Sequence, residues 1–228
     1  MNSNAPASPV GSYLQALPVI AVLRGITPEE IPAIGMALFD AGFRILEVPL
    51  NSPRPFESVR ALAEHFGDRC LVGAGTVLEP DAVGRVAEAG GRLIVMPHSD
   101  PRIIAEAKRQ GLVCLPGVAT PNEAFAALAA GADGLKMFPA EQLPPPVLKA
   151  WRAVLPKGTL LIPVGSIRPD SMAAYWAAGA SGFGTGSSVY KPGATTVEVA
   201  VAASGFAAVL RALPMRAPVA VAPSSLPR

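Results

Sequence analysis

Short apolar runs alternate with amphipathic stretches along this chain at a regular spacing. Eight short β-like runs begin 20 to 26 residues apart, at residues 18–25, 44–50, 70–77, 92–97, 112–118, 134–140, 160–166 and 182–188. Sequences typical of helix starts follow six of them, such as TPEE at Thr27 and TPNEA at Thr120. This spacing is typical of successive βα units with short loops, and eight such units close a parallel barrel.

We therefore expect an α/β fold, a (β/α)8 TIM barrel with a short N-terminal helix. A doubly wound open sheet is the alternative. It is disfavoured because LRGITP, after the first run, has one glycine and lacks the Gly-rich fingerprint of that fold. The expected organisation is a flexible leader over residues 1–10, one barrel domain over 11–214 and a flexible Pro-, Ala- and Ser-rich tail over 215–228.

Composition excludes several classes of partner. The 228 residues are 50% hydrophobic, but no apolar run reaches the roughly 18 residues of a spanning helix. The net charge of +2 has no clustered basic run, which disfavours nucleic acid and anionic membranes. Cys70 and Cys114 lie in apolar runs and are expected to be buried reduced thiols. With no signal-peptide pattern at the N-terminus, we expect a cytoplasmic protein.

Lys136 and Glu47 are charged residues inside strand-like apolar runs. The period of two in a strand points Lys136 away from Leu135 and Met137, towards the barrel lumen. Burial lowers the pKa of an amine, and a neutral amine can attack a ketone to form a Schiff base. Glu47 could then move the protons that iminium chemistry requires. The structural alternative is an ion pair between the two that holds the barrel together.

Other polar or small residues close the remaining runs, where barrel enzymes carry their chemistry. Arg24 could bind a carboxylate or phosphate with its planar donors, and Thr76 could donate to a carboxylate. Backbone N–H groups at the last two strand ends could bind a phosphate. The candidates there are Gly165, Ser166, Gly186 and Ser187. Tight turns would explain the same glycines and serines without a ligand.

The two histidines do not support a metal site. His65 falls in a helix that is expected to face solvent, and His98 follows a strand end, where it could face the pocket or act as a polar loop residue. They are not at metal-ligand spacing, and no carboxylate set completes a divalent-metal site. We therefore expect no metal.

Residues 15 to 212 resemble the class I keto-acid aldolases that cleave 2-keto-3-deoxy-6-phospho sugars. The resemblance rests on motifs in the family's order: AVLRGITP, LEVPLNSP, GAGTVL, PGVATPNEA, LKMFPA, VGSI and GTGSSVY. It implies that Lys136 forms the Schiff base and Glu47 is the proton-transfer acid/base. It also implies that Arg24, Thr76 and Pro97 contact the substrate, that the glycine-rich ends hold its phosphate, that no cofactor is needed and that the protein is a homotrimer.

Within that family the resemblance favours the galactonate branch. Gluconate-type members tend to have arginine where this chain has Asn51 and threonine where it has Val164, and to lack the arginine found here at Arg24. One departure is Ser166, where members commonly have a second glycine. A positive φ there would strain serine, whereas a negative φ would leave its N–H available.

The expected function is cleavage of 2-dehydro-3-deoxy-6-phosphogalactonate to pyruvate and glyceraldehyde 3-phosphate. Two alternatives stay open. The epimeric gluconate could be the main substrate, or the chain could be a non-catalytic barrel that binds phosphorylated sugars.

Overall fold

The computed structural model describes residues 9–214. Residues 1–8 of the expected leader and the whole expected tail, 215–228, lie outside the described residues. The predicted N-terminal helix is present as α1 (Pro9–Ala16). It takes in two residues of the expected leader, and the second of them, Val10, is fully buried. Helix α1 therefore overlaps the expected leader at its last two residues, because Val10 packs in the same apolar cluster as the strand side chains.

Nine short strands lie within residues 9–214, and all of their pairings are parallel. Six form one sheet in the order β5-β4-β3-β2-β1-β9, and three form a second in the order β6-β7-β8. Their bounds are β1 Val19–Val22, β2 Ile45–Pro49, β3 Leu71–Gly75, β4 Leu93–Val95, β5 Val113–Leu115, β6 Gly117–Val118, β7 Leu135–Met137, β8 Leu161–Pro163 and β9 Phe183–Thr185. The expected α/β class with a parallel sheet is confirmed.

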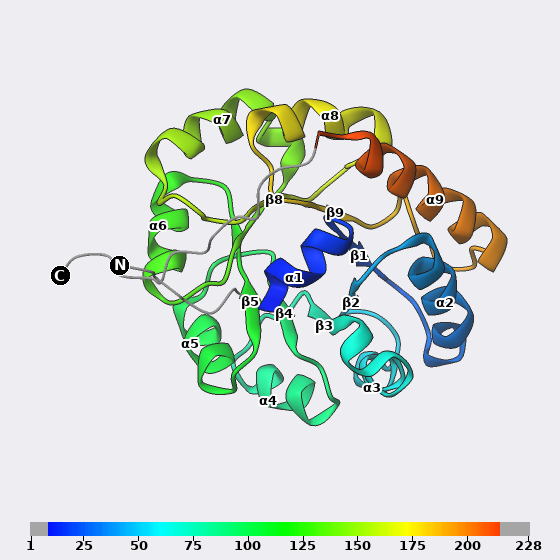
Figure 1. The fold of residues 1–228 in the computed structure, drawn as a ribbon. Helices are drawn as coiled ribbons and strands as arrows, with labels where there is room; N and C mark the ends of the chain where they lie inside the picture. The colour runs from blue at the N-terminus through cyan, green and yellow to red at the C-terminus, as the bar shows by residue number, and fades with distance from the viewer. Residues whose placement is uncertain (1–8, 215–228) are drawn as a thin grey trace, which may run out of the picture.

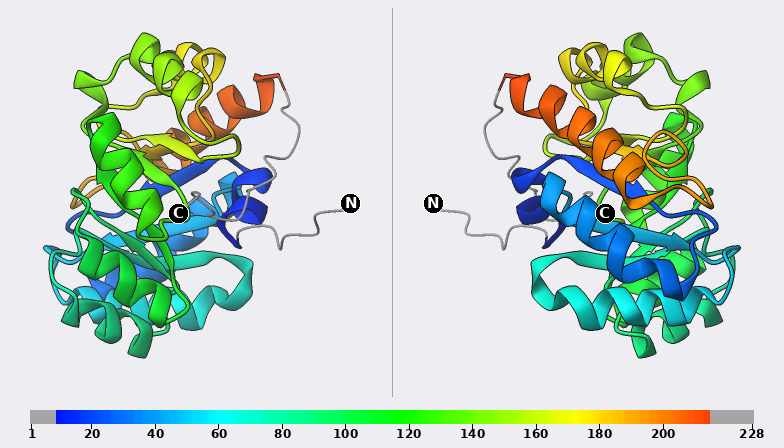
Figure 2. Two further views of the ribbon diagram at one scale, coloured as in Figure 1. Left: turned by 90° about the vertical axis from the view of Figure 1, so that its left-hand side faces the viewer. Right: turned by 90° about the vertical axis from the view of Figure 1, so that its right-hand side faces the viewer.

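The helices lie outside the strands. Their bounds are α2 Ile31–Ala41, α3 Pro55–Phe66, α4 Asp81–Glu88, α5 Pro101–Arg109, α6 Pro121–Ala129, α7 Pro145–Val154, α8 Pro169–Ala178 and α9 Thr196–Ala212, with short 3-10 turns η1 Pro28–Glu30, η2 Gly67–Arg69 and η3 Ala140–Gln142. In Figure 1 the strands surround the centre of the molecule, α2 to α9 lie around them, and α1 crosses the middle. The side views in Figure 2 place α1 at one end of the strands.

The fifth apolar run differs from the sequence prediction. Residues 112–118 were expected to form one strand, but they form β5 and β6 on either side of Pro116. Proline has no N–H to donate to a strand ladder, so the pairing is interrupted there. The carbonyl of Pro116 still accepts from the N–H of Lys136 at 2.9 Å, so β7 pairs alongside the interruption.

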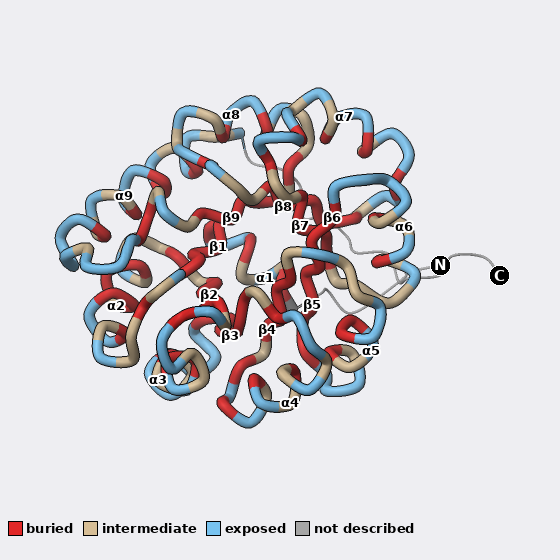
Figure 3. The backbone as a smooth tube through the Cα atoms, turned by 180° about the vertical axis from the view of Figure 1, so that it is seen from behind, coloured by how far each residue is buried: buried red, intermediate tan, exposed pale blue. Residues whose placement is uncertain are grey.

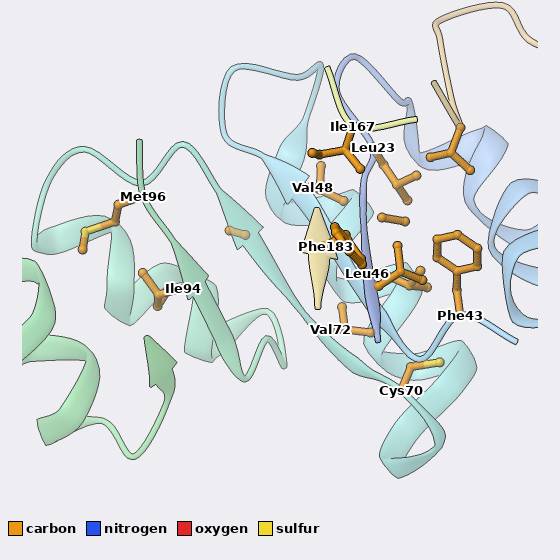
Figure 4. Close-up of a cluster of buried hydrophobic side chains, with 14 of the residues drawn as sticks. Leu23, Phe43, Leu46, Val48, Cys70, Val72, Ile94, Met96, Ile167 and Phe183 are labelled. Carbon is orange, nitrogen blue, oxygen red and sulfur yellow. The ribbon is translucent and has the colours of Figure 1, made fainter. Parts of the chain in front are cut away.

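The strands are buried on both faces, as expected for parallel strands covered by helices (Figure 3). Alternate side chains enter two apolar clusters. The outer cluster packs under the helices and includes Leu23, Phe43, Leu46, Val72 and Phe183 (Figure 4). The inner cluster fills the space between the strands, and Val10 and Leu14 of α1 pack against its strand members Ile20, Ile45, Leu71, Leu93 and Ile162. The inner side chains thus have apolar neighbours at the α1 end.

Local signals in the sequence account for the helix ends. Thr120 begins α6 with a capping box: its hydroxyl accepts from the N–H of Glu123 at 3.3 Å, and the Glu123 carboxylate accepts from the N–H of Thr120 at 2.9 Å. Gly42 ends α2 at φ 111°, a left-handed conformation that glycine adopts without strain. Such signals end these short helices and return the chain to the next strand.

Cys70 and Cys114 are buried free thiols, as expected. Within residues 9–214 no helix is long and apolar enough to cross a membrane.

We expect Leu14→Ala to lower the free energy of unfolding by about 2–4 kcal/mol, because it leaves a cavity between α1 and the inner strand residues. Chemical denaturation followed by far-UV circular dichroism measures the loss. Gln15→Ala, at the exposed neighbour on the same helix, is the matched control and should change stability by no more than about 0.5 kcal/mol. Equal effects of the two substitutions would show that α1 does not stabilise the strands.

Candidate active site

The predicted site residues lie at one end of the strands. All strand pairings are parallel, so the carboxyl ends of the strands face the same side. Glu47 and Lys136 lie within β2 and β7. The others lie within three residues after a strand end: Arg24 after β1, Thr76 after β3, Pro97 after β4, Gly165 and Ser166 after β8, and Gly186 and Ser187 after β9. The chain thus presents this set on the side where barrel enzymes carry their sites.

Lys136 and Glu47 line one small internal cavity. The other residues around it are apolar side chains and one glycine: Ile20, Val22, Val95, Leu115, Ile162, Val164 and Gly184. Leu135 and Met137 both belong to the outer cluster, which confirms that Lys136 points inward, opposite to its neighbours. Lys136 is 8% exposed and Glu47 is 2% exposed. Two ionisable groups therefore share one small apolar cavity.

The Glu47 carboxyl is not neutralised by a close ion pair. Among the ion pairs of residues 9–214, none joins Glu47 to Lys136, and Oε2 of Glu47 has no hydrogen-bond partner there. Burial raises the pKa of Glu47 to about 7, and the positive charges of Lys136 and Arg24 only partly oppose it. A carboxyl with this pKa can both give and accept a proton near neutral pH.

The Lys136 amine is also buried, and burial shifts its pKa in the opposite direction from that of Glu47. Burial lowers the pKa of Lys136, the Glu47 carboxylate raises it, and the nearby Arg24 charge lowers it further. Nζ lies 4.6 Å from the centre of the Phe138 ring. The side chain is held in a mostly apolar site where the neutral amine, the nucleophilic form, is favoured more than in water.

Gly75 makes the Glu47 position possible, and the sequence analysis did not single it out. A Cβ at residue 75 would overlap the Glu47 carboxyl group, so only glycine at the end of β3 leaves room for it. The signal was present in the sequence, because a glycine within a strand often marks close approach of another group. Its partner could not be named without the strand register that aligns β2 with β3.

Arg24, Asn51 and Thr76 form a polar cluster across three neighbouring loops. Nη1 of Arg24 donates to Oδ1 of Asn51 at 2.7 Å, and Nη2 donates to Oγ1 of Thr76 at 3.5 Å. Thr76 has φ 53°, an uncommon conformation for a β-branched residue. In the sequence, Asn51 served only to distinguish the galactonate branch from the gluconate branch. In the structure its side chain accepts a hydrogen bond from the Arg24 guanidinium and holds it in place. This cluster offers donors for an anionic group beside the Glu47 and Lys136 cavity.

The glycine- and serine-containing turns after β8 and β9 are neighbours, because Val164 and Gly184 form a parallel bridge. Gly165 has φ 118° and Ser166 has φ 48°, so the serine is in the left-handed region that the sequence analysis identified as strained. The N–H groups of Ser166 and Ser187 donate to no acceptor in residues 9–214. These donors can bind an anion such as phosphate.

Pro97 and His98 are less closely tied to the cavity. Pro97 is partly buried, and its backbone lies close to Gly117. A Cβ added at residue 117 would lie 2.5 Å from the carbonyl carbon of Pro97. His98 is exposed, and its backbone carbonyl accepts from the N–H of Gly117 at 3.1 Å. His65 lies on the exposed face of α3, as predicted. No group of three or more His, Cys, Asp or Glu residues positioned to hold a metal occurs in residues 9–214.

Comparison with known proteins agrees with this arrangement. The family model described as "KDPG and KHG aldolase" matches residues 10–201. The chain belongs to this aldolase family. A Rhizobium meliloti protein named "Probable 2-dehydro-3-deoxy-6-phosphogalactonate aldolase" is 48% identical over 182 residues, which cover 80% of this chain and 86% of the relative. The Escherichia coli "2-dehydro-3-deoxy-6-phosphogalactonate aldolase" is 44% identical over 190 residues, covering 83% and 93%.

Solved structures of aldolases share the fold of this family member. The one described as "Native KDPGal structure" has a TM-score of 0.85 and 43% identity, over 86% of this chain and 95% of the other. The KDPG aldolase from Legionella pneumophila, described with pyruvate captured as a covalent carbinolamine intermediate, has a TM-score of 0.76 and 27% identity, over 92% and 100%. A relative with the same architecture therefore holds pyruvate covalently.

The raised pKa of Glu47 predicts a stability difference that depends on pH. The folded-state pKa of about 7 lies above the ordinary value of 4.5, so its contribution to stability is fully present below pH 4.5 and is lost as pH rises through about 7. Glu47→Gln, which carries no charge, should be more stable than the parent by about 3 kcal/mol at pH 8. It should lose that advantage at pH 4.5, as measured by urea denaturation. An advantage that does not change with pH would refute the raised pKa.

Proposed function

We propose that this aldolase cleaves 2-dehydro-3-deoxy-6-phosphogalactonate to pyruvate and D-glyceraldehyde 3-phosphate through a Schiff base on Lys136. The observation that carries the proposal is the pair of buried groups, Lys136 and Glu47, in one apolar cavity without an ion pair between them. A purely structural ion pair stabilises a fold most when its two charges are in contact, and the Lys136 and Glu47 charges are not in contact.

In the proposed sequence the neutral amine of Lys136 attacks the C2 ketone and forms a carbinolamine. Glu47 delivers a proton to the leaving hydroxyl, water departs, and a protonated imine remains. The Glu47 carboxylate then accepts the proton of the C4 hydroxyl. The C3–C4 bond breaks, and its electron pair moves into the imine to form an enamine while the aldehyde is released. Protonation at C3 and addition of water release pyruvate and restore the amine.

The same geometry assigns roles to the flanking residues. Arg24 and Thr76, already joined by a hydrogen bond, would bind the substrate carboxylate, with Pro97 lining the same side. The N–H groups at the ends of β8 and β9 would bind the phosphate, contributed by Gly165, Ser166, Gly186 and Ser187. Because the protonated imine withdraws the electrons, the proposed reaction needs no cofactor.

We infer the galactonate configuration from two lines of support. Two relatives, 48% and 44% identical, carry the galactonate name. The Arg24 to Asn51 hydrogen bond gives a role in the site to two positions at which gluconate-type members tend to differ. The gluconate epimer is then the weaker substrate.

We further propose that the two sheets act as one closed (β/α)8 barrel in a single domain over residues 11–214. In this view β5 and β6 together are the fifth strand, interrupted by Pro116, and the bridge between Val164 and Gly184 joins the second sheet to the first. The two buried free thiols support a cytoplasmic location. The family resemblance supports a homotrimer, which the mass of the particle in solution would check.

Incubation with pyruvate and borohydride tests the chemistry. Borohydride should fix a stable mass increase on Lys136, and Lys136→Met should abolish both the adduct and turnover.

Glu47→Gln should lower kcat by about 100- to 10,000-fold, because proton transfer loses its carrier. Addition of a chelator should leave turnover unchanged. Binding of phosphorylated sugar with neither adduct nor cleavage would favour the non-catalytic alternative.

Coupled detection of pyruvate from the two C4 epimers tests the substrate. We expect kcat/KM for the galactonate epimer to exceed that for the gluconate epimer by about 10-fold or more, the effect of about 1.4 kcal/mol of differential transition-state binding. A higher value for the gluconate epimer would overturn the assignment while leaving the Schiff-base mechanism in place.

A further inference from the structure

Ser166 is a non-glycine residue with φ 48°, directly after Gly165 with φ 118°. The left-handed conformation costs an L-residue about 1–2 kcal/mol, whereas glycine adopts it readily. Something in the surroundings must therefore stabilise this turn when serine occupies the position. The hydroxyl of Ser166 donates to Oε1 of Glu141, a residue on the separate turn η3 that follows β7.

Gly165 allows the Glu141 carboxylate to approach. A Cβ at residue 165 would lie 2.5 Å from Oε2 of Glu141, so a larger residue would exclude the carboxylate from the turn. One glycine thus admits the acceptor, and the next residue supplies the donor.

The backbone beneath Glu141 is fixed on two sides. The N–H of Ala140 donates to the carbonyl of Val164 at 2.9 Å, which joins η3 to the end of β8. The buried hydroxyl of Tyr175, on α8, donates to the carbonyl of Ala140 at 2.9 Å. An acceptor on an anchored backbone can hold its partner in a defined place, because little conformational entropy remains to be lost.

We propose that Glu141 is a positioning residue that acts through the Ser166 hydroxyl to hold the turn after β8 in its left-handed, anion-binding conformation. The inference rests on the proposed phosphate site at this turn. Since the hydroxyl proton is committed to Glu141, Ser166 contacts the phosphate with its backbone N–H rather than its side chain. Glu141 touches neither the reacting carbons nor Lys136 in this scheme, so its loss affects binding of the phosphate and not the chemical step.

The test compares Glu141→Ala with Glu141→Gln, two variants that lose the same charge but differ in whether an acceptor for Ser166 remains. With Ser166 in place, KM for the phosphorylated substrate should be about 5- to 10-fold higher in Glu141→Ala than in Glu141→Gln, with kcat equal within about twofold. In a Ser166→Gly background the ratio should fall to about 1, because glycine needs no hydrogen bond to keep the conformation. Ser166→Ala should raise KM about 5- to 10-fold over the parent, and Ser166→Gly by no more than about threefold.

Two further readouts separate this inference from the proposed function. The unphosphorylated substrate analogue should show no difference between the Glu141 variants. The dissociation constant of inorganic phosphate, measured by calorimetry, should follow the KM pattern and does not depend on turnover. A parent protein that cleaves neither epimer refutes the proposed function, and the phosphate measurements then still decide the role of Glu141. Equal Ala-to-Gln ratios with Ser166 in place and in the Ser166→Gly background would overturn the inference.

Discussion

The site depends on the desolvation of two ionisable groups in one apolar cavity. Lys136 and Glu47 are nearly inaccessible to water, and the other side chains that line their cavity are aliphatic. In water an ammonium and a carboxylate would both be charged at neutral pH. Burial moves the two pKa values towards each other, down for the amine and up for the carboxyl. The arrangement that reduces stability at neutral pH is the one that makes a nucleophile and a proton carrier available.

The remainder of the fold keeps that cavity apolar and fixes its shape. Alternate strand residues pack outward under the helices, and the others pack inward with α1 at one end (Figures 1 and 4). Glycine is used where an inner side chain would collide with the functional groups, as Gly75 shows for Glu47. At the other end of the strands, polar contacts between successive loops, such as Arg24 to Asn51, fix donors around the opening. Packing and chemistry thus use opposite ends of the same strands.

Sequence patterns predicted most of the fold because they report on local physics. Alternation, helix caps and spacing predicted the order of strands and helices, and the inward direction of Lys136 followed from a period of two. The prediction of one continuous strand over 112–118 was wrong in detail, because Pro116 divides this run into β5 and β6. The role of each site residue stays a proposal, but their gathering at the carboxyl ends of the strands was expected.

By itself, the sequence determined which residue types stand at the ends of which apolar runs, since backbone propensity and periodicity act over a few neighbouring residues. Only the tertiary structure decided which of these residues contact one another. The contact between Gly75 and Glu47 and the hydrogen bond from Ser166 to Glu141 join residues 25 or more positions apart. The sequence also left the sign of φ at Ser166 open, and the structure shows that it is positive. Such contacts depend on strand register and loop packing, which bring distant residues together and leave no local pattern in the chain.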